Sequence, residues 1–250
     1  MLRTVFVVLI MLPGTITVIG LETVVVLLLL PFRRFRNDVL HRINCTWGKL
    51  FFLISGSSIT VDGLENFDRK KAHIIMMNHQ GAFDIFLLFA VLPGQFRWLS
   101  KDTYFKIPVL GWFMTLSGYV SIVREKKKSA YESMLAAGVR LKENRSIAIF
   151  PEGTRSHDGE VQRFKPGILI LTENYPAVPI LPVVIHGTTH IMKKGSFAIK
   201  PSHVHVEILP PFDINAVHGD RNAKISALER LMRDKHVHVK SKAHARSKHR

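Results

Sequence analysis

The sequence predicts an α/β fold, a mostly parallel sheet flanked by helices, with an N-terminal membrane-anchoring helical segment. Three observations lead to this prediction. Residues 4–32 are almost entirely apolar, strand and helix signals alternate from Ile59 onward, and two apolar runs end abruptly in polar loops at residues 78–84 and 151–156. Repeated strand–helix–strand units form parallel sheets covered by helices.

We expect three parts along the 250 residues. Residues 1–56 form the membrane-anchoring helical segment, an apolar run followed by an amphipathic helix. Residues 57–234 form an α/β catalytic domain, and this length is sufficient for one substantial core. Residues 235–250 carry Lys, Arg and His without any acidic residue. This composition predicts a disordered basic tail. The tail is either attracted to anionic lipid or serves only to keep the protein soluble.

The composition indicates an anionic partner. The net charge is +16 and 47% of the residues are hydrophobic. High hydrophobicity beside high positive charge favours a membrane surface, and no RNA-recognition or zinc-finger signature supports nucleic acid. The single cysteine, Cys45, excludes an intramolecular disulfide and fits a reducing compartment.

The apolar run of residues 4–32 is longer than the roughly 20 residues that span a bilayer. Pro13-Gly14 interrupts it, and Glu22 lies inside it. Two arrangements therefore remain open. The run forms either one kinked spanning helix or a hairpin that enters one leaflet and returns.

Charge sets the orientation of this segment. Arg33, Arg34 and Arg36 follow the run, whereas only Arg3 precedes it, which predicts a cytoplasmic location for the downstream chain. Residues 37–55 then mix apolar and basic side chains, as in an amphipathic helix on the membrane surface. The same pattern fits a core helix of the catalytic domain.

The remaining elements follow from periodicity. Strands are expected at residues 74–78, 96–100, 119–123, 147–150, 179–185 and 203–209. Helices are expected at residues 83–92, 129–144 and 222–233, and a further helical stretch after Asp102 breaks at Pro108. In the last strand Val204, Val206 and Ile208 share one face, which predicts that the other face is solvated.

The first chemical group lies where residues 74–78 end. Asn78-His79 follows the apolar run, and Asp84 comes five residues after the histidine. A histidine can take a proton near neutral pH, and a carboxylate can orient its ring. Residues five apart do not share a helix face, so this pair requires a turn or helix start between them, which Gly81 allows.

The second group is the loop Phe150-Pro151-Glu152-Gly153-Thr154-Arg155-Ser156. Gly153 would allow close backbone approach, Arg155 can bind a phosphate bidentately, and Thr154 and Ser156 can donate hydrogen bonds. Lys165 could add a second cation. The alternative is an ordinary surface turn with a salt bridge.

Together the two groups resemble the glycerolipid acyltransferase family, most closely the bacterial 1-acyl-sn-glycerol-3-phosphate acyltransferases. Two intermediate blocks match as well: Lys101 with Ile107-Pro108 and Gly111, leading through Gly118 to Ile122-Val123-Arg124, and then residues 180–188. The resemblance covers residues 60–190. Gly81 stands where the family often has Ser, and Val123 where many members have Asp, which weakens assignment to one acceptor.

The resemblance implies transfer of a fatty acyl group from acyl-CoA or acyl carrier protein to the sn-2 hydroxyl of 1-acyl-sn-glycerol 3-phosphate, giving phosphatidic acid. His79 would be the general base and Asp84 its orienting partner, with Asn78 or backbone N–H groups as candidate oxyanion donors. The chain contains no Gly-x-Ser-x-Gly sequence, so direct attack is favoured over a serine-acyl intermediate.

The resemblance also implies the substrate-binding residues. Arg155, with Lys101 and Arg124, would hold the phosphate, and Glu152 would orient Arg155 or a glycerol hydroxyl, with Gly153 and Thr154 completing the loop. No cofactor is implied. His203, His205 and Glu207 alternate on one strand and could bind zinc. Solvated strand-face residues are the favoured interpretation, and no role is assigned to His186 and His190.

Other functions stay open. The acceptor could be another lysophospholipid or a lyso-aminolipid, the protein could bind membrane lipid without catalysis, or it could be a hydrolase. The expected location is a membrane, the bacterial inner membrane, with the catalytic domain on its cytoplasmic face. The expected partners are membrane lipids, lysophosphatidic acid and the thioester donor.

Overall fold

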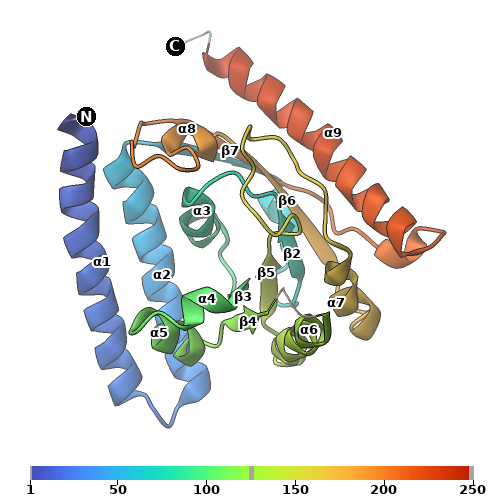
Figure 1. Cartoon of the computed structure of the whole chain (residues 1–250), viewed down its shortest axis with the longest axis horizontal. Coiled ribbons are helices and arrows are strands. Elements are labelled where there is room, and N and C mark those ends of the chain that lie inside the picture. Colours follow the sequence, from blue (N-terminus) through green and yellow to red (C-terminus); the bar gives the residue numbers. More distant parts are fainter. Residues whose placement is uncertain (1, 124–126, 248–250) are drawn as a thin grey trace.

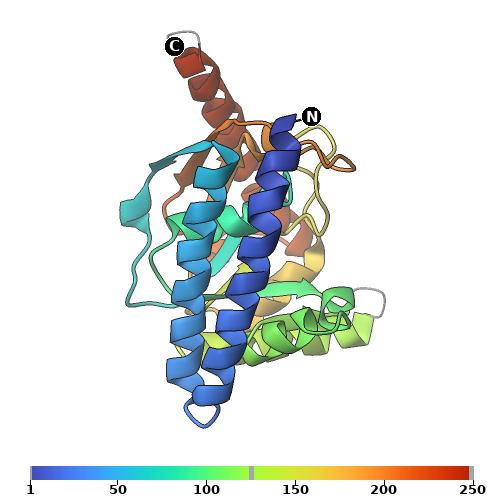
Figure 2. The same ribbon diagram turned by 90° about the vertical axis from the view of Figure 1, so that its left-hand side faces the viewer.

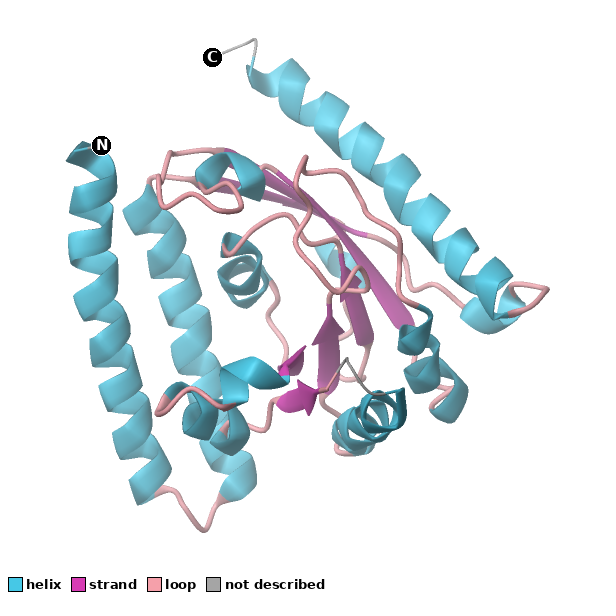
Figure 3. Ribbon diagram, viewed as in Figure 1, coloured by secondary structure: helices cyan, strands magenta, loops and turns pink. Residues whose placement is uncertain are grey.

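The computed structural model describes residues 2–123 and 127–247. Among these residues a seven-stranded sheet lies between two layers of helices (Figure 3). Its strands, in the order β1-β7-β6-β2-β5-β3-β4, are β1 (Ser58–Asp62), β7 (His203–Ile208), β6 (Ile180–His186), β2 (Ile74–Met77), β5 (Ser146–Ile149), β3 (Phe96–Lys101) and β4 (Val120–Ile122).

The sheet is mostly parallel, as predicted. β6, β2, β5, β3 and β4 pair in parallel, with Ile74 of β2 opposite Ile147 on one side and Ile180 on the other. β7 runs antiparallel to β6, and β1 runs parallel to β7. The central strands therefore all end at one edge of the sheet, and only the β1–β7 pair points the other way.

The described helices are α1 (Leu2–Leu28), α2 (Arg33–Ser55), α3 (Phe83–Val91), α4 (Asp102–Phe105), α5 (Leu110–Leu116), α6 (Lys127–Lys142), α7 (Leu169–Asn174), α8 (Thr188–Ile191) and α9 (Arg221–Ser247). Successive residues of a strand point to opposite faces of the sheet, so they pack into two separate hydrophobic cores. Ile74 and Met76 pack towards α6, α7 and α9, whereas Ile75 and Met77 pack towards α2 and α3.

The N-terminal segment is a hairpin of two long helices. α1 is one helix that includes Pro13, and α2 returns antiparallel beside it (Figure 2). Contacts occur near both ends: Arg3 donates to the Ser55 carbonyl at 3.2 Å, and Asn44 donates to the buried Glu22 at 2.7 Å. The apolar run of residues 4–32 is therefore a single helix as far as Leu28, and the hairpin forms between this helix and α2 rather than within the run. Within the described residues, α1 is the one helix long and apolar enough to cross a bilayer.

α2 belongs to the packed domain as much as to the anchor. Leu40, Trp47 and Phe52 are buried, and Gly48 lies so close to α3 that a Cβ there would come within 2.7 Å of the Phe86 carbonyl oxygen. Leu53, on another side of the helix, is 73% exposed. The core-helix interpretation of residues 37–55 thus describes the inner face of α2.

The C-terminal segment corrects the sequence prediction. Residues 235–247 continue α9 and are not disordered, whereas residues 248–250 lie outside the described part. α9 packs along β6 and β7 (Figure 1). Its Lys235 lies 3.7 Å from Glu207 of β7, and Lys242 lies 3.6 Å from Asp62 of β1. The helix forms because its basic residues meet acids of the sheet while its apolar residues enter the core.

Candidate active site

Three neighbouring parallel strands deliver polar residues to one edge of the sheet. β2 ends at Met77 and is followed by His79, β5 ends at Ile149 and is followed by Glu152, and β6 ends at His186 and is followed by Thr188. Ligand crevices of open α/β sheets form at the carboxyl ends of such strands. The strand order therefore brings together residues that are more than 100 positions apart.

His79 and Asp84 form the expected pair. The His79 Nδ1 atom lies 2.7 Å from the Asp84 Oδ2 atom. α3 begins at Phe83, so Asp84 is in its first turn and the chain reverses between the two residues. The turn that the spacing required is present.

Asp84 is fully buried, yet its carboxylate has four donors. The backbone N–H groups of Gln80 and Gly81 donate to Oδ2 at 2.6 and 2.8 Å, together with His79, and the Thr188 hydroxyl donates to Oδ1. An acceptor-only carboxylate suits this surrounding. His79 therefore carries its proton on Nδ1, which leaves the lone pair of Nε2 for chemistry.

Aromatic stacking fixes the plane of the His79 ring. The ring lies on Phe150 with a centroid distance of 3.7 Å and an interplanar angle of 10°. Phe150 in turn stacks on Trp98 of β3 at 5.0 Å. The His79 side chain remains 15% exposed, so the fixed ring still reaches the surface. The sequence prediction missed this stack, because it depends on β3 lying beside β5.

Asn78 does not serve as an oxyanion donor. It is fully buried, its Nδ2 donates to the Ile185 carbonyl at 3.0 Å, and its Oδ1 accepts from the Ile185 N–H at 2.8 Å. Both ends of the amide thus join β2 to β6. The candidate role of Asn78 as an oxyanion donor is therefore wrong, and its role is structural.

The side chain of Glu152 holds the backbone of His79. Its side chain is 2% exposed, and Oε1 accepts the His79 N–H at 3.0 Å. Burial raises the pKa of the carboxyl to about 8, and the nearby Asp84 and Asp158 add to the rise, while the hydrogen bonds oppose it. No contact between Glu152 and Arg155 is found among the described residues. The expected orientation of Arg155 by Glu152 is therefore absent.

The predicted phosphate-binding residues lie at the same edge of the sheet. Gly153 adopts a φ of 75°, a backbone conformation that favours glycine, and lets the loop turn after β5. Thr154 is exposed, while Arg155 and Lys101, the last residue of β3, are half-buried. Arg124 lies outside the described residues.

A further cation supports this loop and was not singled out from the sequence. Lys194 donates to the Arg155 carbonyl at 3.0 Å and lies 2.8 Å from His157 Nε2. It comes from the segment after α8, so only the fold brings it to the loop after β5. No local sequence pattern identifies such a residue.

An apolar cavity of about 390 Å³ adjoins the pair. Its walls come from β3, β4, β5, α6 and the short 3₁₀ helix Pro166–Ile168. Phe150, which carries the His79 ring, lines the cavity, and Gly153 and Lys165 contribute its polar side. Phe150 therefore lies between the cavity and the His79 ring, and the loop after β5 forms part of the cavity wall.

The possible zinc ligands of β7 have other partners. His203 bonds Ser58 and Thr60, His205 bonds Asp62 at 2.9 Å, and the described residues contain no group of three metal-ligating side chains. The expected solvated face is wrong for His205, which is fully buried. α9 packs against β7 and accounts for this burial.

The chain is similar to known proteins in both sequence and structure. Residues 58–186 match a family model described as acyltransferase. A 1-acyl-sn-glycerol-3-phosphate acyltransferase of Limnanthes douglasii is 32% identical over 190 residues, which are 76% of this chain and 66% of that protein. One from Saccharomyces cerevisiae is 32% identical over 188 residues, 74% of this chain and 60% of that protein.

Bacterial proteins match as well. A 1-acyl-sn-glycerol-3-phosphate acyltransferase of Borreliella burgdorferi is 30% identical over 166 residues, which are 66% of each chain. The crystal structure of the LPA acyltransferase PlsC from Thermotoga maritima superposes with a TM-score of 0.79 at 26% identity, covering 96% of this chain and 95% of that one. Of the plant relatives, the chain spans 48% to 66% of their length.

The raised pKa of Glu152 predicts a pH-dependent stability. The folded protein holds this proton up to about pH 8 whereas the unfolded chain releases it near 4.5, so the contribution of Glu152 to stability falls as pH rises between these values. Glu152→Gln keeps an oxygen acceptor for His79 without the ionisation. Its melting temperature, relative to wild type, should therefore rise between about pH 5 and about pH 8.5.

The control for this experiment is the exposed Glu65→Gln, which should leave the pH dependence of the melting temperature unchanged. If Glu152→Gln shifts melting equally at both pH values, Glu152 does not titrate in this range. That result would contradict the assignment.

Proposed function

The chain belongs to the acyltransferase family, and from this premise we propose that it is a 1-acyl-sn-glycerol-3-phosphate O-acyltransferase. It transfers a fatty acyl group from acyl-CoA or acyl carrier protein to the sn-2 hydroxyl, giving phosphatidic acid. The observation that carries the proposal is the His79–Asp84 pair, fixed by buried hydrogen bonds beside an apolar cavity.

His79 acts as the general base. Its Nε2 takes the proton of the acceptor hydroxyl as the oxygen forms a bond to the thioester carbonyl carbon. The tetrahedral intermediate then breaks its C–S bond, and the leaving thiolate recovers the proton from His79. Asp84 stabilises the imidazolium between these steps and keeps the ring in one tautomer.

The loop after β5 binds the phosphate of the acceptor. Arg155 is the principal cation, and Lys101 assists it from the end of β3. Arg124 is the further cation that the family resemblance implies. Lys194 supports the arrangement by its hydrogen bond to the Arg155 carbonyl. Glu152 holds the His79 backbone and does not touch substrate, since its side chain is 2% exposed.

The apolar cavity receives the acyl chain of the donor. It is lined largely by aliphatic side chains, and Phe150, which stacks on the His79 ring, forms part of its wall. Burial of methylene groups there would supply binding energy of about 0.8 kcal/mol each. The chemistry requires only a thioester, so CoA and carrier-protein donors are both compatible with it. No metal or organic cofactor enters the reaction.

The protein is seated in a membrane through the α1–α2 hairpin. α1 exposes a long apolar surface, with Leu9 at 67% and Leu28 at 72% exposure. α5 contacts α1, and this region adds Ile107 and Trp112, which is 69% exposed. Amphipathic rings such as Trp favour the membrane interface. We place this surface on the bilayer, with the catalytic domain on the cytoplasmic side of a bacterial inner membrane.

The base assignment predicts the effect of His79→Ala. This variant should lose at least about 10³-fold in acyl transfer, because the substitution removes the group that accepts the hydroxyl proton. Thiol release from acyl-CoA is measured with and without 1-acyl-sn-glycerol 3-phosphate. The exposed His238→Ala is the control and should keep full activity.

Three outcomes of that assay would contradict the proposal. Full transfer by folded His79→Ala removes the base assignment. Wild-type thiol release that does not depend on acceptor indicates a hydrolase. No release at all with either donor indicates a lipid-binding protein without catalysis.

If Arg155 binds the phosphate, its substitution should impair only acceptors that carry a phosphate. Arg155→Gln should raise KM for 1-acyl-sn-glycerol 3-phosphate by about tenfold or more, as expected for the loss of a charge-assisted pair. Activity on a monoacylglycerol without phosphate should be nearly unchanged. The exposed Arg163→Gln on the same loop serves as control. An equal loss on both acceptors would show that Arg155 does not bind the phosphate.

If this surface lies on the bilayer, polar substitutions within it should weaken binding of the protein to membranes. Replacing Ile107 and Trp112 together by Asp should lower the fraction of protein bound to anionic vesicles, because two exposed apolar side chains leave the bilayer surface. Activity on acceptor dispersed in detergent should be retained. Val237→Asp, on α9 and 60% exposed, is the control. If the double variant binds vesicles as well as wild type does, the surface that contacts the membrane lies elsewhere on the protein.

A further inference from the structure

His236 of α9 occupies an unusual position for a polar residue. It lies on the stripe that carries Leu228, Met232 and Val239, all fully buried against the sheet, and is itself 1% exposed. An imidazole in such a stripe loses its hydration, which is costly unless a hydrogen bond replaces it. A specific partner is therefore expected.

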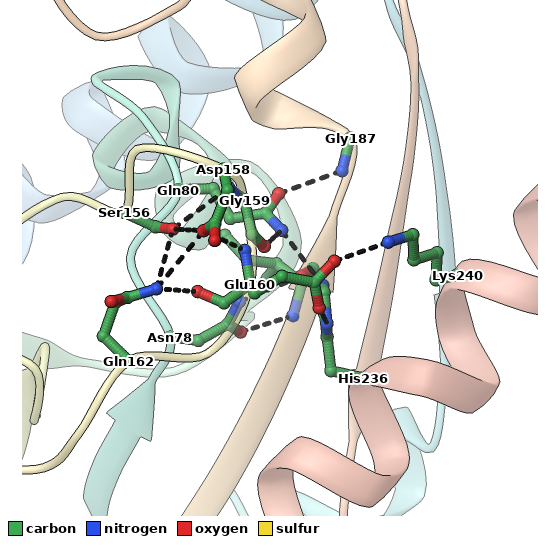
Figure 4. Close-up of polar contacts among 11 residues, drawn as sticks. Asn78, Gln80, Ser156, Asp158, Gly159, Glu160, Gln162, Gly187, His236 and Lys240 are labelled. Carbon is green, nitrogen blue, oxygen red and sulfur yellow. Dashed lines mark hydrogen bonds and ion pairs between the residues drawn. The ribbon is translucent and has the colours of Figure 1, made fainter.

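The partner is the side chain of Gln80, the residue directly after His79 (Figure 4). Gln80 Oε1 accepts the Gly187 N–H at 3.0 Å, and Nε2 donates to the Gly159 carbonyl. These two backbone groups fix which end of the amide is nitrogen. The second N–H of Gln80 is left for His236 Nε2, 3.1 Å away, which must therefore accept.

The surroundings favour the tautomer that this bond requires. His236 Nδ1 lies 3.3 Å from Glu160 Oε2, and Lys240 binds the other oxygen of the same carboxylate. The His186 ring lies 5.4 Å from the His236 ring on the β6 side. A proton on Nδ1 faces the carboxylate, and Nε2 keeps its lone pair for Gln80.

Gln80 transmits this contact to the catalytic pair. Its backbone N–H donates to Asp84 Oδ2 at 2.6 Å, the same oxygen that holds His79 Nδ1. Its side chain meanwhile joins the ends of two other segments, Gly187 after β6 and Gly159 in the loop after β5. A change in the Gln80 side chain therefore moves the peptide that orients the Asp84 carboxylate.

We propose that His236 is a positioning residue for acyl transfer, which accepts a hydrogen bond from Gln80 and so holds the residue 78–82 loop in the geometry that aligns His79 with Asp84. The inference rests on the proposed function. It makes α9 part of the catalytic apparatus, in addition to its role in covering β6 and β7. The competing interpretation is that His236 only fills space beneath α9.

The bond to Gln80 gives the proposal a pH signature. Protonation of His236 at Nε2 places an N–H against the Gln80 amide N–H₂, so two donors oppose each other. Burial lowers the pKa of His236, which keeps the neutral form; Glu160 and Asp158 oppose this, whereas Lys240 assists it. Activity should therefore fall as pH drops through the pKa of His236.

The decisive comparison uses two substitutions at one site. His236→Phe keeps a ring but removes the acceptor, and should lower kcat by about tenfold with KM for donor and acceptor within about twofold. His236→Gln offers a carbonyl oxygen near the position of Nε2, and should restore most of kcat without the histidine titration. The activity of His236→Gln should therefore fall less steeply at acidic pH than that of wild type.

Matched controls separate positioning from packing. His238→Phe and His238→Gln change an exposed histidine of the same helix, and should leave kcat and the pH profile unchanged. Gln80→Leu removes the other partner. In combination with His236→Phe it should lower kcat no further than Gln80→Leu alone, because both changes break one connection.

The inference is overturned if folded His236→Phe keeps wild-type kcat, or if His236→Gln is no better than His236→Phe and both lose activity only in proportion to melting temperature. These results leave the proposed function intact, since wild type still transfers and His79→Ala does not. A wild-type protein without acyl transfer would instead overturn the proposed function, and this inference with it.

Discussion

The buried carboxylate of Asp84 is the constraint on which the rest of the site depends. A fully buried charge is unfavourable unless donors surround it, and Asp84 receives four. Three donors come from the loop before α3, which forces that loop to curl around the carboxylate. The fourth, Thr188, comes from beyond β6. The site therefore cannot form from the residue 78–84 segment alone. It requires β6 to lie beside β2 in parallel, as the sheet has it.

The same reasoning extends across the sheet. β5 lies on the other side of β2, and its loop supplies Glu152 for the His79 N–H and Ser156 for the His79 carbonyl. The N–H and the carbonyl of His79 are thus both held by the loop after β5, while Phe150 from that loop stacks on the His79 ring. Phe150, Pro151 and Gly153 also line the apolar cavity.

Much of this arrangement could be predicted from local sequence. Apolar runs located the central strands, and the ends of those runs identified His79, Asp84 and the Arg155 loop. What escaped prediction depends on contacts between distant segments. Thr188, Trp98 and Lys194 acquire their positions from strand order, which one sequence does not reveal. Glu152 is expected from its residue type to orient Arg155 or a glycerol hydroxyl, whereas its burial directs its side chain to the His79 backbone.

The C-terminal helix shows how composition alone can mislead. Residues 235–250 have no acidic residue, which suggests charge repulsion and disorder, but the acids that balance them lie elsewhere in the chain. Glu207, Asp62 and Glu160 meet Lys235, Lys242 and Lys240 in the folded protein. Val239 continues the apolar stripe of Leu228 and Met232 beyond the expected helix end, and His236 lies on it. Because these cations are engaged with the sheet and the loop after β5, less of the tail's charge is available for lipid. The helix that they hold in place carries His236, whose imidazole contacts Gln80. Under the proposed role of His236, the order of this helix therefore serves the geometry of the active site.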